Sequence, residues 1–209
     1  MGAPLALLSR MSVLLRASGR RLSRDDGYTL VELLMTCAII AIMGGMAAGV
    51  SASFVNRSKA DGAVQSFMTI LEVARTRAIA ERRNFFVTFT QPNRVTVQRE
   101  EIVNGVATGL TTVTNATLDN QLIFKKYASL PDTPDMFGNA TAIDFDGTGP
   151  IAFTSDGSLV DSAGDLSNLT ILFGNSSNTS TDAARAVTIM GATGLVKNFA
   201  WGRTAWIGQ

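Results

Sequence analysis

The sequence predicts an α+β fold in which one long N-terminal helix packs on an antiparallel β domain. Two observations predict it. Up to about residue 83, apolar residues recur at the spacing of one helix face, and beyond that point apolar and polar residues alternate. Short β-type segments then follow one another, separated by glycine-, asparagine- and proline-containing turns.

The chain begins with a basic segment. Residues 1–27 carry five arginines and two aspartates, whereas from Phe85 onward there are seven basic and eleven acidic side chains. A basic segment ahead of an apolar run is a targeting layout. Residues 1–27 are therefore predicted to be a leader peptide, and Met11 would serve as the start of a shorter leader that is still basic.

An apolar run follows the leader. Residues 33–50 contain eighteen residues without a charge, which is the threshold length for a membrane-spanning helix. We predict that residues 28–52 form the transmembrane half of the N-terminal helix. The five arginines of the leader all precede the run. The positive-inside rule therefore places the N-terminus in the cytoplasm and the rest of the chain across the membrane.

Residues 53–83 are predicted to form the amphipathic half of the same helix. Their apolar residues step by four, three, four, three and four positions, which is one face of a 3.6-residue helix. Met68 and Ile79 are expected to widen this face. The stripe consists of Ala60, Val64, Phe67, Leu71, Ala74 and Ala78.

Residues 84–209 are predicted to form the β domain, a sheet or sandwich. A turn at Gln91-Pro92-Asn93 joins the first two strands into a hairpin. Turn signals around 131–134, 146–147, 156–157 and 174–182 separate the later ones. The expected strands are 85–90, 94–99, 122–127, 141–145, 151–153, 168–173, 184–190 and 195–201.

The composition argues against an enzyme or a metal site. Cys37 is the single cysteine and histidine is absent, which excludes intrachain disulfides, Ser–His and Cys–His nucleophiles and imidazole ligands. Asp144 and Asp146 lie in a segment that looks like the start of a calcium loop, but the bidentate glutamate of an EF-hand is missing. An Asp-Gly turn is the favoured interpretation, and no cofactor is predicted.

The most informative segment runs from Gly27 to Leu34. Glu32 is a lone carboxylate at the edge of a segment otherwise suited to lipid, where a charge costs about 2.5–3.5 kcal/mol at mid-bilayer. Cleavage after Gly27 would create an α-amine on Tyr28 that could neutralise Glu32 of another subunit. The alternative is that Glu32 merely tops a single-pass helix near the headgroups.

Gly27, Tyr28 and Glu32 match the processing site of type IV prepilins and pseudopilins, which this segment resembles; tyrosine replaces the usual phenylalanine. The resemblance implies a type IV pilin-like fold, and cleavage by a prepilin peptidase that also N-methylates Tyr28. It further implies that Glu32 guides docking into a filament. The expected location is the inner membrane, single-pass, with a periplasmic β domain and an inner-membrane assembly platform as partner.

Residues 63–89 are similar to the GspH/FimT family, in which a helix rich in alanine and arginine runs into the first strand. Residues 153–157 resemble the family's turn before the last strands, and residues 185–189 with 194–197 resemble its closing hairpin. The resemblance implies a minor pseudopilin of a type II secretion system, placed with other pseudopilins or pilins at a filament tip. A minor pilin that primes type IV pili is the alternative.

Three other interpretations remain open at this point. Nucleic-acid binding, known for some FimT-like members, requires clustered positive charge, and the net charge from Phe85 onward is −4. A secreted β protein cleaved after Val50-Ser51-Ala52 would begin at Ser53, but the amphipathic stripe continues across that site. A membrane-anchored hydrolase lacks a recognisable pair of catalytic carboxylates.

Overall fold

The computed structural model describes residues 28–119, 121–177 and 180–209, without the side chains of residues 46–53. Gly27 and the rest of the predicted leader lie outside the described residues. The chain divides into two compact units after Gly45. Helix α1 (Leu30–Glu81) contributes to both units, and all eleven strands belong to the second.

In the first unit, residues 30–45 are helical, and every one of them is exposed. Apolar side chains cover all sides of this part of α1, unlike an amphipathic surface helix, which has one apolar stripe. Among the described residues, no helix combines the length and the hydropathy that a membrane crossing requires.

In the second unit, α1 buries the predicted stripe. All six expected positions have exposed fractions of at most 3%, and Ala63 and Met68 join them. The helix ends in a Schellman motif: Arg82 takes a left-handed conformation (φ 50°) and the Arg83 amide donates to the Ala78 carbonyl at 3.2 Å. The reversal directs the chain back along the helix into the first strand.

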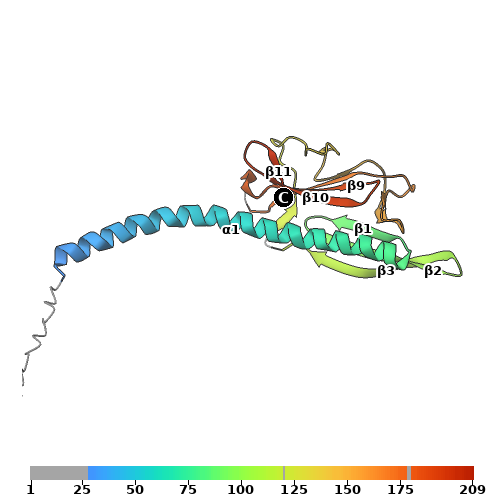
Figure 1. Ribbon diagram of the computed structural model, residues 1–209, viewed down its shortest axis with the longest axis horizontal. Helices are drawn as coiled ribbons and strands as arrows, with labels where there is room; N and C mark the ends of the chain where they lie inside the picture. The colour runs from blue at the N-terminus through green and yellow to red at the C-terminus, as the bar shows by residue number, and fades with distance from the viewer. Residues whose placement is uncertain (1–27, 120, 178–179) are drawn as a thin grey trace, which may run out of the picture. The chain divides into compact units, whose positions relative to one another are not determined.

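The first sheet has five strands in the order β3-β2-β1-β6-β7 and is antiparallel throughout. Strands β1 and β2 form the predicted hairpin, with Val87 opposite Val97. Figure 1 shows the β2–β3 hairpin extending past the end of α1. The strands are β1 (Phe85–Thr90), β2 (Arg94–Val103), β3 (Val106–Thr117), β6 (Ile151–Phe153) and β7 (Leu159–Val160).

The second sheet has the order β11-β10-β9-β8-β4, and β5 also pairs with β8. Its central strands, β8 and β9, are buried almost throughout, because side chains cover both of their faces. The elements are β4 (Leu122–Phe124), β5 (Ile143–Phe145), β8 (Leu169–Asn175), the 3-10 helix η1 (Thr181–Ala183), β9 (Arg185–Met190), β10 (Leu195–Trp201) and β11 (Trp206–Gly208).

The larger of two buried apolar clusters holds α1 and both sheets together. Phe67 of α1 lies at its centre, 5.1 Å from the ring of Phe173 on β8 and 6.0 Å from that of Phe89 on β1. Phe124 of β4 completes this group of four rings. The side chain of Phe67 therefore joins the helix to strands of both sheets.

The predicted α+β fold is confirmed, and so is the turn at residues 91–93. Three expectations were wrong. Ile79 does not widen the core stripe, since 43% of it is exposed. The strand expected at 122–127 ends at Phe124, and the one expected at 94–99 continues to Val103. Strands β3, β7 and β11 had not been expected at all.

Candidate processing and assembly site

Thr29 caps the start of α1. Its side-chain oxygen accepts a hydrogen bond from the Glu32 amide at 3.2 Å, and its carbonyl accepts one from the Leu33 amide at 3.1 Å. This is the geometry of a helix N-cap, which satisfies amides that have no partner within the helix. The signal for this cap in the sequence is Thr29-x-x-Glu32, a capping-box pattern.

Glu32 lies in the first turn of α1, where the partial positive charge of the helix N-terminus favours a carboxylate. Tyr28 lies just outside the helix and is 82% exposed. The structure thus places Tyr28 and Glu32 on either side of the helix start. Gly27, the third predicted site residue, lies outside the described residues.

The helix that follows the motif exposes large apolar side chains. Their exposed fractions range from 52% for Ile39 to 75% for Leu30. Such a surface is costly in water and therefore marks a segment that another apolar environment covers. The side chains are Leu30, Val31, Leu33, Leu34, Met35, Ile39, Ile40, Ile42 and Met43.

In the β domain, the two motif segments near residues 157 and 194 come together against α1. The Arg75 side-chain Nε donates to the Gly157 carbonyl at 3.1 Å. A Cβ on Gly194 would overlap that same carbonyl oxygen and press on the Arg75 side chain. Gly194 also has φ +61°, a conformation that glycine adopts at little cost. These residues therefore form a structural contact between the helix and the closing hairpin.

A second contact joins α1 to β9. Arg185 is only 4% exposed, and its Nε donates to the Asp61 carboxylate of α1 at 2.5 Å. The other two nitrogens of the same guanidinium, Nη1 and Nη2, donate to the backbone carbonyls of Asp182, Ala184 and Arg57. A buried guanidinium requires this full set of acceptors, because an unpaired charge in the interior is strongly unfavourable.

The turn at residues 153–157 is organised by Asp156. Its carboxylate accepts hydrogen bonds from the Thr154 hydroxyl and from the Ser158 amide and hydroxyl. These donors, with Thr154 the largest contribution, lower the pKa of Asp156 to about 2. The carboxylate thus serves the turn as an acceptor, and its partners are all within two residues.

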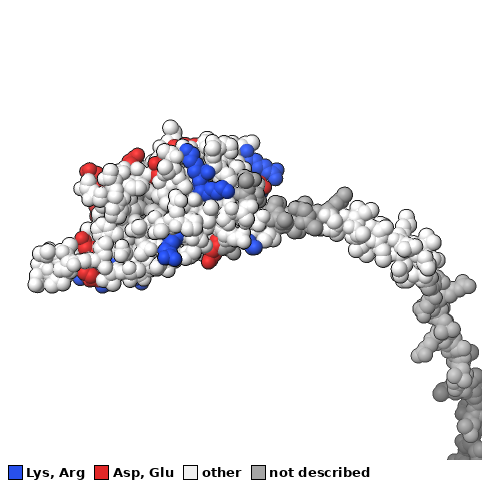
Figure 2. Space-filling view, turned by 180° about the vertical axis from the view of Figure 1, so that it is seen from behind, with Lys and Arg blue, Asp and Glu red and all other residues white. Residues whose placement is uncertain are grey.

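Lys197, in the hairpin considered for nucleic-acid binding, donates to the Asp135 carboxylate at 2.7 Å, and the Thr188 hydroxyl donates to the other oxygen at 2.6 Å. Burial raises the pKa of Asp135, but these two hydrogen bonds outweigh it and hold the pKa below its usual value. On the face shown in Figure 2, basic side chains occur in separate groups with acidic ones nearby. The positive charge of Lys197 is therefore already paired within the domain.

Asp144 and Asp146 lie within β5 and just beyond its end. Asp144 lies in β5 and accepts a hydrogen bond from the Ala140 amide at 2.5 Å, while the Asp146 amide donates to the Asn168 carbonyl. In the part of the chain that the structure describes, no three carboxylates or cysteines come close enough to hold a metal ion. The Asp144 carboxylate therefore organises a loop.

Comparison with known proteins agrees with this arrangement. A family model for the prokaryotic N-terminal methylation motif matches residues 22–48, and one for the type II transport protein GspH matches residues 63–194. No curated protein matches significantly.

Among solved structures, the minor pseudopilin EpsH from the type 2 secretion system of Vibrio cholerae is 18% identical (TM-score 0.46; 69% of this chain and 98% of that one). The type IV minor pilin FimU of Pseudomonas aeruginosa is 15% identical (TM-score 0.46; 74% and 96%). The methylation motif lies over the capped start of α1, and the GspH model covers most of the buried helix face, strands β1 to β9 and the contact between Arg75 and Gly157. The chain therefore belongs to the GspH/FimT family of pilin-like proteins, as a minor pseudopilin or minor pilin.

Proposed function

We propose that the chain is a minor pseudopilin of a type II secretion system, in which it assembles through α1 into a short pilus-like filament that supports protein export. The observation that carries the proposal is the order of features along the chain. A methylation motif, a helix with exposed apolar side chains on all sides and a GspH domain follow one another without a break.

The proposed site consists of Gly27, Tyr28 and Glu32. A prepilin peptidase cuts the Gly27–Tyr28 bond and methylates the new amine of Tyr28. The exposure of Tyr28 outside the helix supports this, because a peptidase needs an extended, accessible segment around the bond that it cuts. Glu32 then pairs with the Tyr28 amine of a neighbouring subunit.

In this proposal, residues 28–52 anchor the chain in the inner membrane, with the leader in the cytoplasm and the domain of residues 84–209 in the periplasm. The exposed apolar residues of α1 and the basic leader support this orientation. The partners are other pseudopilins, the prepilin peptidase and the inner-membrane assembly platform. The chain acts as a structural subunit, and its function requires no catalytic group or cofactor.

Gly27→Ala tests the processing step. A peptidase that requires glycine at this position will leave the variant uncut, so we expect precursor to accumulate and assembly to stop. Mass spectrometry of the membrane fraction measures the result: wild-type protein should begin at N-methyl-Tyr28. Functional protein that retains residues 1–27, or normal processing of Gly27→Ala, would contradict the proposal.

Deletion of the gene separates the secretion role from the alternative, a minor pilin that primes type IV pili. The secretion role predicts that exported proteins are retained in the periplasm while surface pili remain. Loss of pili with normal export would assign the chain to pilus assembly instead. Complementation with the wild-type gene is the control in both assays.

A further inference from the structure

Strand β3 leaves one edge of the first sheet open. Within the described part of the chain it is hydrogen-bonded to β2 on one side only, and it is twelve residues long. The outer strands at the other three sheet edges, β7, β4 and β11, are two or three residues long. Short edge strands are a common protection against unwanted pairing, so β3 is the exception.

Strand β3 also lacks the charges that usually protect an edge. Residues 104–118 contain no lysine, arginine, aspartate or glutamate. Val106 and Leu110 are 64% and 49% exposed, and Val103 beside them on β2 is 56% exposed. In Figure 2 the end of the domain that carries the β2–β3 hairpin has no coloured side chains at its tip. An uncharged edge of this length is a template for another strand.

The register identifies the backbone groups that face outward. The Leu118 amide donates to the Asn93 carbonyl at 2.7 Å, and this pair continues the β2–β3 register at Arg94 and Thr117. Hydrogen-bonded and non-hydrogen-bonded pairs alternate in an antiparallel ladder. Asn115 and Thr117 therefore direct their amides and carbonyls toward the free edge.

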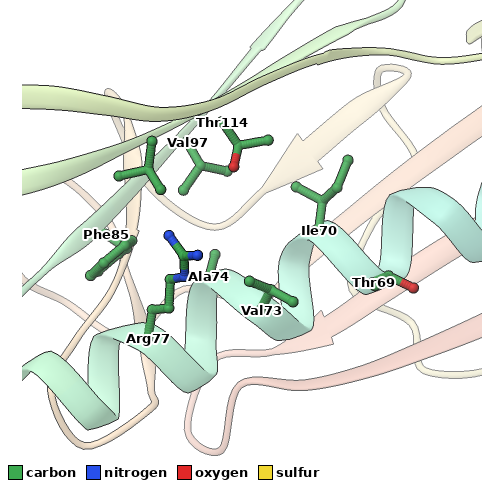
Figure 3. Close-up of a pocket in the computed structure, with 9 residues that line it drawn as sticks. Thr69, Ile70, Val73, Ala74, Arg77, Phe85, Val97 and Thr114 are labelled. Carbon is green, nitrogen blue, oxygen red and sulfur yellow. The ribbon is translucent and has the colours of Figure 1, made fainter.

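An apolar pocket of about 120 Å³ lies between this strand and α1. Figure 3 shows Ile70 reaching from the helix toward Val97 and Thr114 on the strands, and Val73 lines the pocket beside it. Val113 also lines the pocket; it is the extra residue of a β-bulge, because Val97 pairs with Thr114 and Gln98 with Thr112. An apolar cavity of about 150 Å³ holds a benzene molecule, so this pocket has room for one aliphatic side chain.

Arg77 lines the same pocket. Its guanidinium reaches from α1 toward the strands (Figure 3), and among the described residues none forms a hydrogen bond or an ion pair with it. The pocket thus combines an apolar floor with one available positive charge. A carboxylate next to an apolar side chain is the chemistry that fits both.

We propose that the β3 edge and this pocket bind an extended segment of a different subunit by strand addition. Its backbone pairs with Asn115 and Thr117, an aliphatic side chain enters the pocket, and a neighbouring carboxylate meets Arg77. Main-chain pairing supplies affinity in this mode and the side-chain pocket supplies selectivity. The inference rests on the proposed function, in which the chain meets other filament subunits.

A second copy of this chain does not fit as an antiparallel partner strand. Strand β3 runs opposite to the packed part of α1 (Figure 1). Antiparallel pairing of two β3 strands would point the N-terminal ends of the two packed helices in opposite directions. Subunits that assemble side by side through α1, as the proposed function requires, have their packed helices in the same direction and cannot adopt that arrangement.

Photo-crosslinking in cells tests the proposal. The full-length chain carries p-benzoylphenylalanine in place of Thr117, an exposed residue of the edge. We expect an adduct with another filament subunit, identified by mass spectrometry. Asn115→Pro removes the outward-facing amide and should reduce the adduct about tenfold or more, whereas Asn115→Ala keeps the amide and should leave it unchanged.

The pocket has its own matched pair of variants. Val73→Phe fills the pocket and should also reduce the adduct, whereas Thr76→Phe adds an aromatic ring on the same helix away from the pocket and should not. Circular dichroism must show that both variants remain folded. No adduct, an adduct made only of two copies of this chain, or an adduct insensitive to Asn115→Pro would overturn the proposal. If Tyr28 is still methylated and the secretion system still exports its proteins, the proposed function stands even where the strand-addition proposal fails.

Discussion

Glu32 has two roles open to it at the scale of a single residue. As the third residue of α1 it sits where the helix dipole favours a negative charge, and it occupies the acidic position of a capping-box pattern with Thr29. As a lone carboxylate at the start of an apolar helix it is also the group proposed to meet the Tyr28 amine of a neighbour. The two roles can be separated because a capping box accepts glutamine as well as glutamate, whereas pairing with an amine requires the charge.

The first prediction therefore concerns Glu32→Gln. We expect normal cleavage after Gly27 and an unchanged domain, but weaker docking to neighbouring subunits, because only the charge is lost. Crosslinking of the variant to partner subunits, together with an export assay, measures this. Thr29→Val is the matched control: it removes the cap, at a cost of about 1 kcal/mol, and keeps the charge. Wild-type crosslinking and export by Glu32→Gln would show that the carboxylate does not act in docking.

The Asp156 carboxylate makes the stability of its turn depend on pH. Its pKa in the folded protein is about 2, against 3.8 for an unperturbed aspartate. Because the folded-state pKa is the lower one, the ionised form stabilises the fold above pH 4, and this contribution is lost as the pH falls from about 4 to about 2. The side chain is exposed, so solvent screens part of the effect.

We predict that Asp156→Asn lowers the melting temperature at pH 7 and flattens its dependence on pH between about 4 and 2. Thermal unfolding followed by circular dichroism across this range provides the measurement. Asp119→Asn serves as the control, since the Asp119 carboxylate accepts no hydrogen bond within the described residues. If the melting temperatures of Asp156→Asn and wild type depend on pH in the same way, the Asp156 carboxylate does not stabilise the turn.

At the scale of elements, α1 is held against the β domain by two turns, one at Gly157 and one at Gly194. The Arg75 side chain meets the turn between β6 and β7 through Gly157, and the turn between β9 and β10 presses on both through Gly194. No side chain fits at residue 194 because the space is already filled by a backbone carbonyl. The three segments therefore interlock.

Gly194→Ala is predicted to destabilise the domain by more than the cost of its backbone conformation. The backbone strain alone amounts to about 1 kcal/mol, and overlap with the Gly157 carbonyl adds to it. Gly164→Ala is a close control, because Gly164 has φ +87° but nothing within 4 Å of its added Cβ. Urea unfolding of both variants compares the two free energies. A loss no greater for Gly194→Ala than for Gly164→Ala would refute the steric argument.

At the scale of the whole molecule, the sequence predicted the elements that have a clear period. The stripe from Ala60 to Ala78 was found because one helix face is buried and the other is not. Strand β3 was missed because both of its sides are largely exposed, so no apolar alternation marks it. Strands β7 and β11 are too short to show a period.

The functional and structural side chains differ in the same respect: some belong to a local sequence pattern and others do not. Gly27, Tyr28 and Glu32 are adjacent in sequence, so a local motif suffices to predict them. Arg185 looked like an ordinary strand residue, because its acceptor Asp61 lies 124 positions away. Contacts of that kind depend on the tertiary fold and leave no local pattern.

These long separations determine when the domain can fold. Arg57 pairs with Asp182 and Asp61 with Arg185, at separations of 125 and 124 residues, so the apolar face of α1 gains its final partners only when the end of the chain arrives. Contacts between distant segments are slow to form because closing a long loop costs entropy before it yields any stabilisation. During synthesis the side chains of Phe67 and Leu71 therefore stay uncovered on the emerging helix. The time from the exit of α1 to the exit of β9 is the interval in which this protein most needs protection from aggregation.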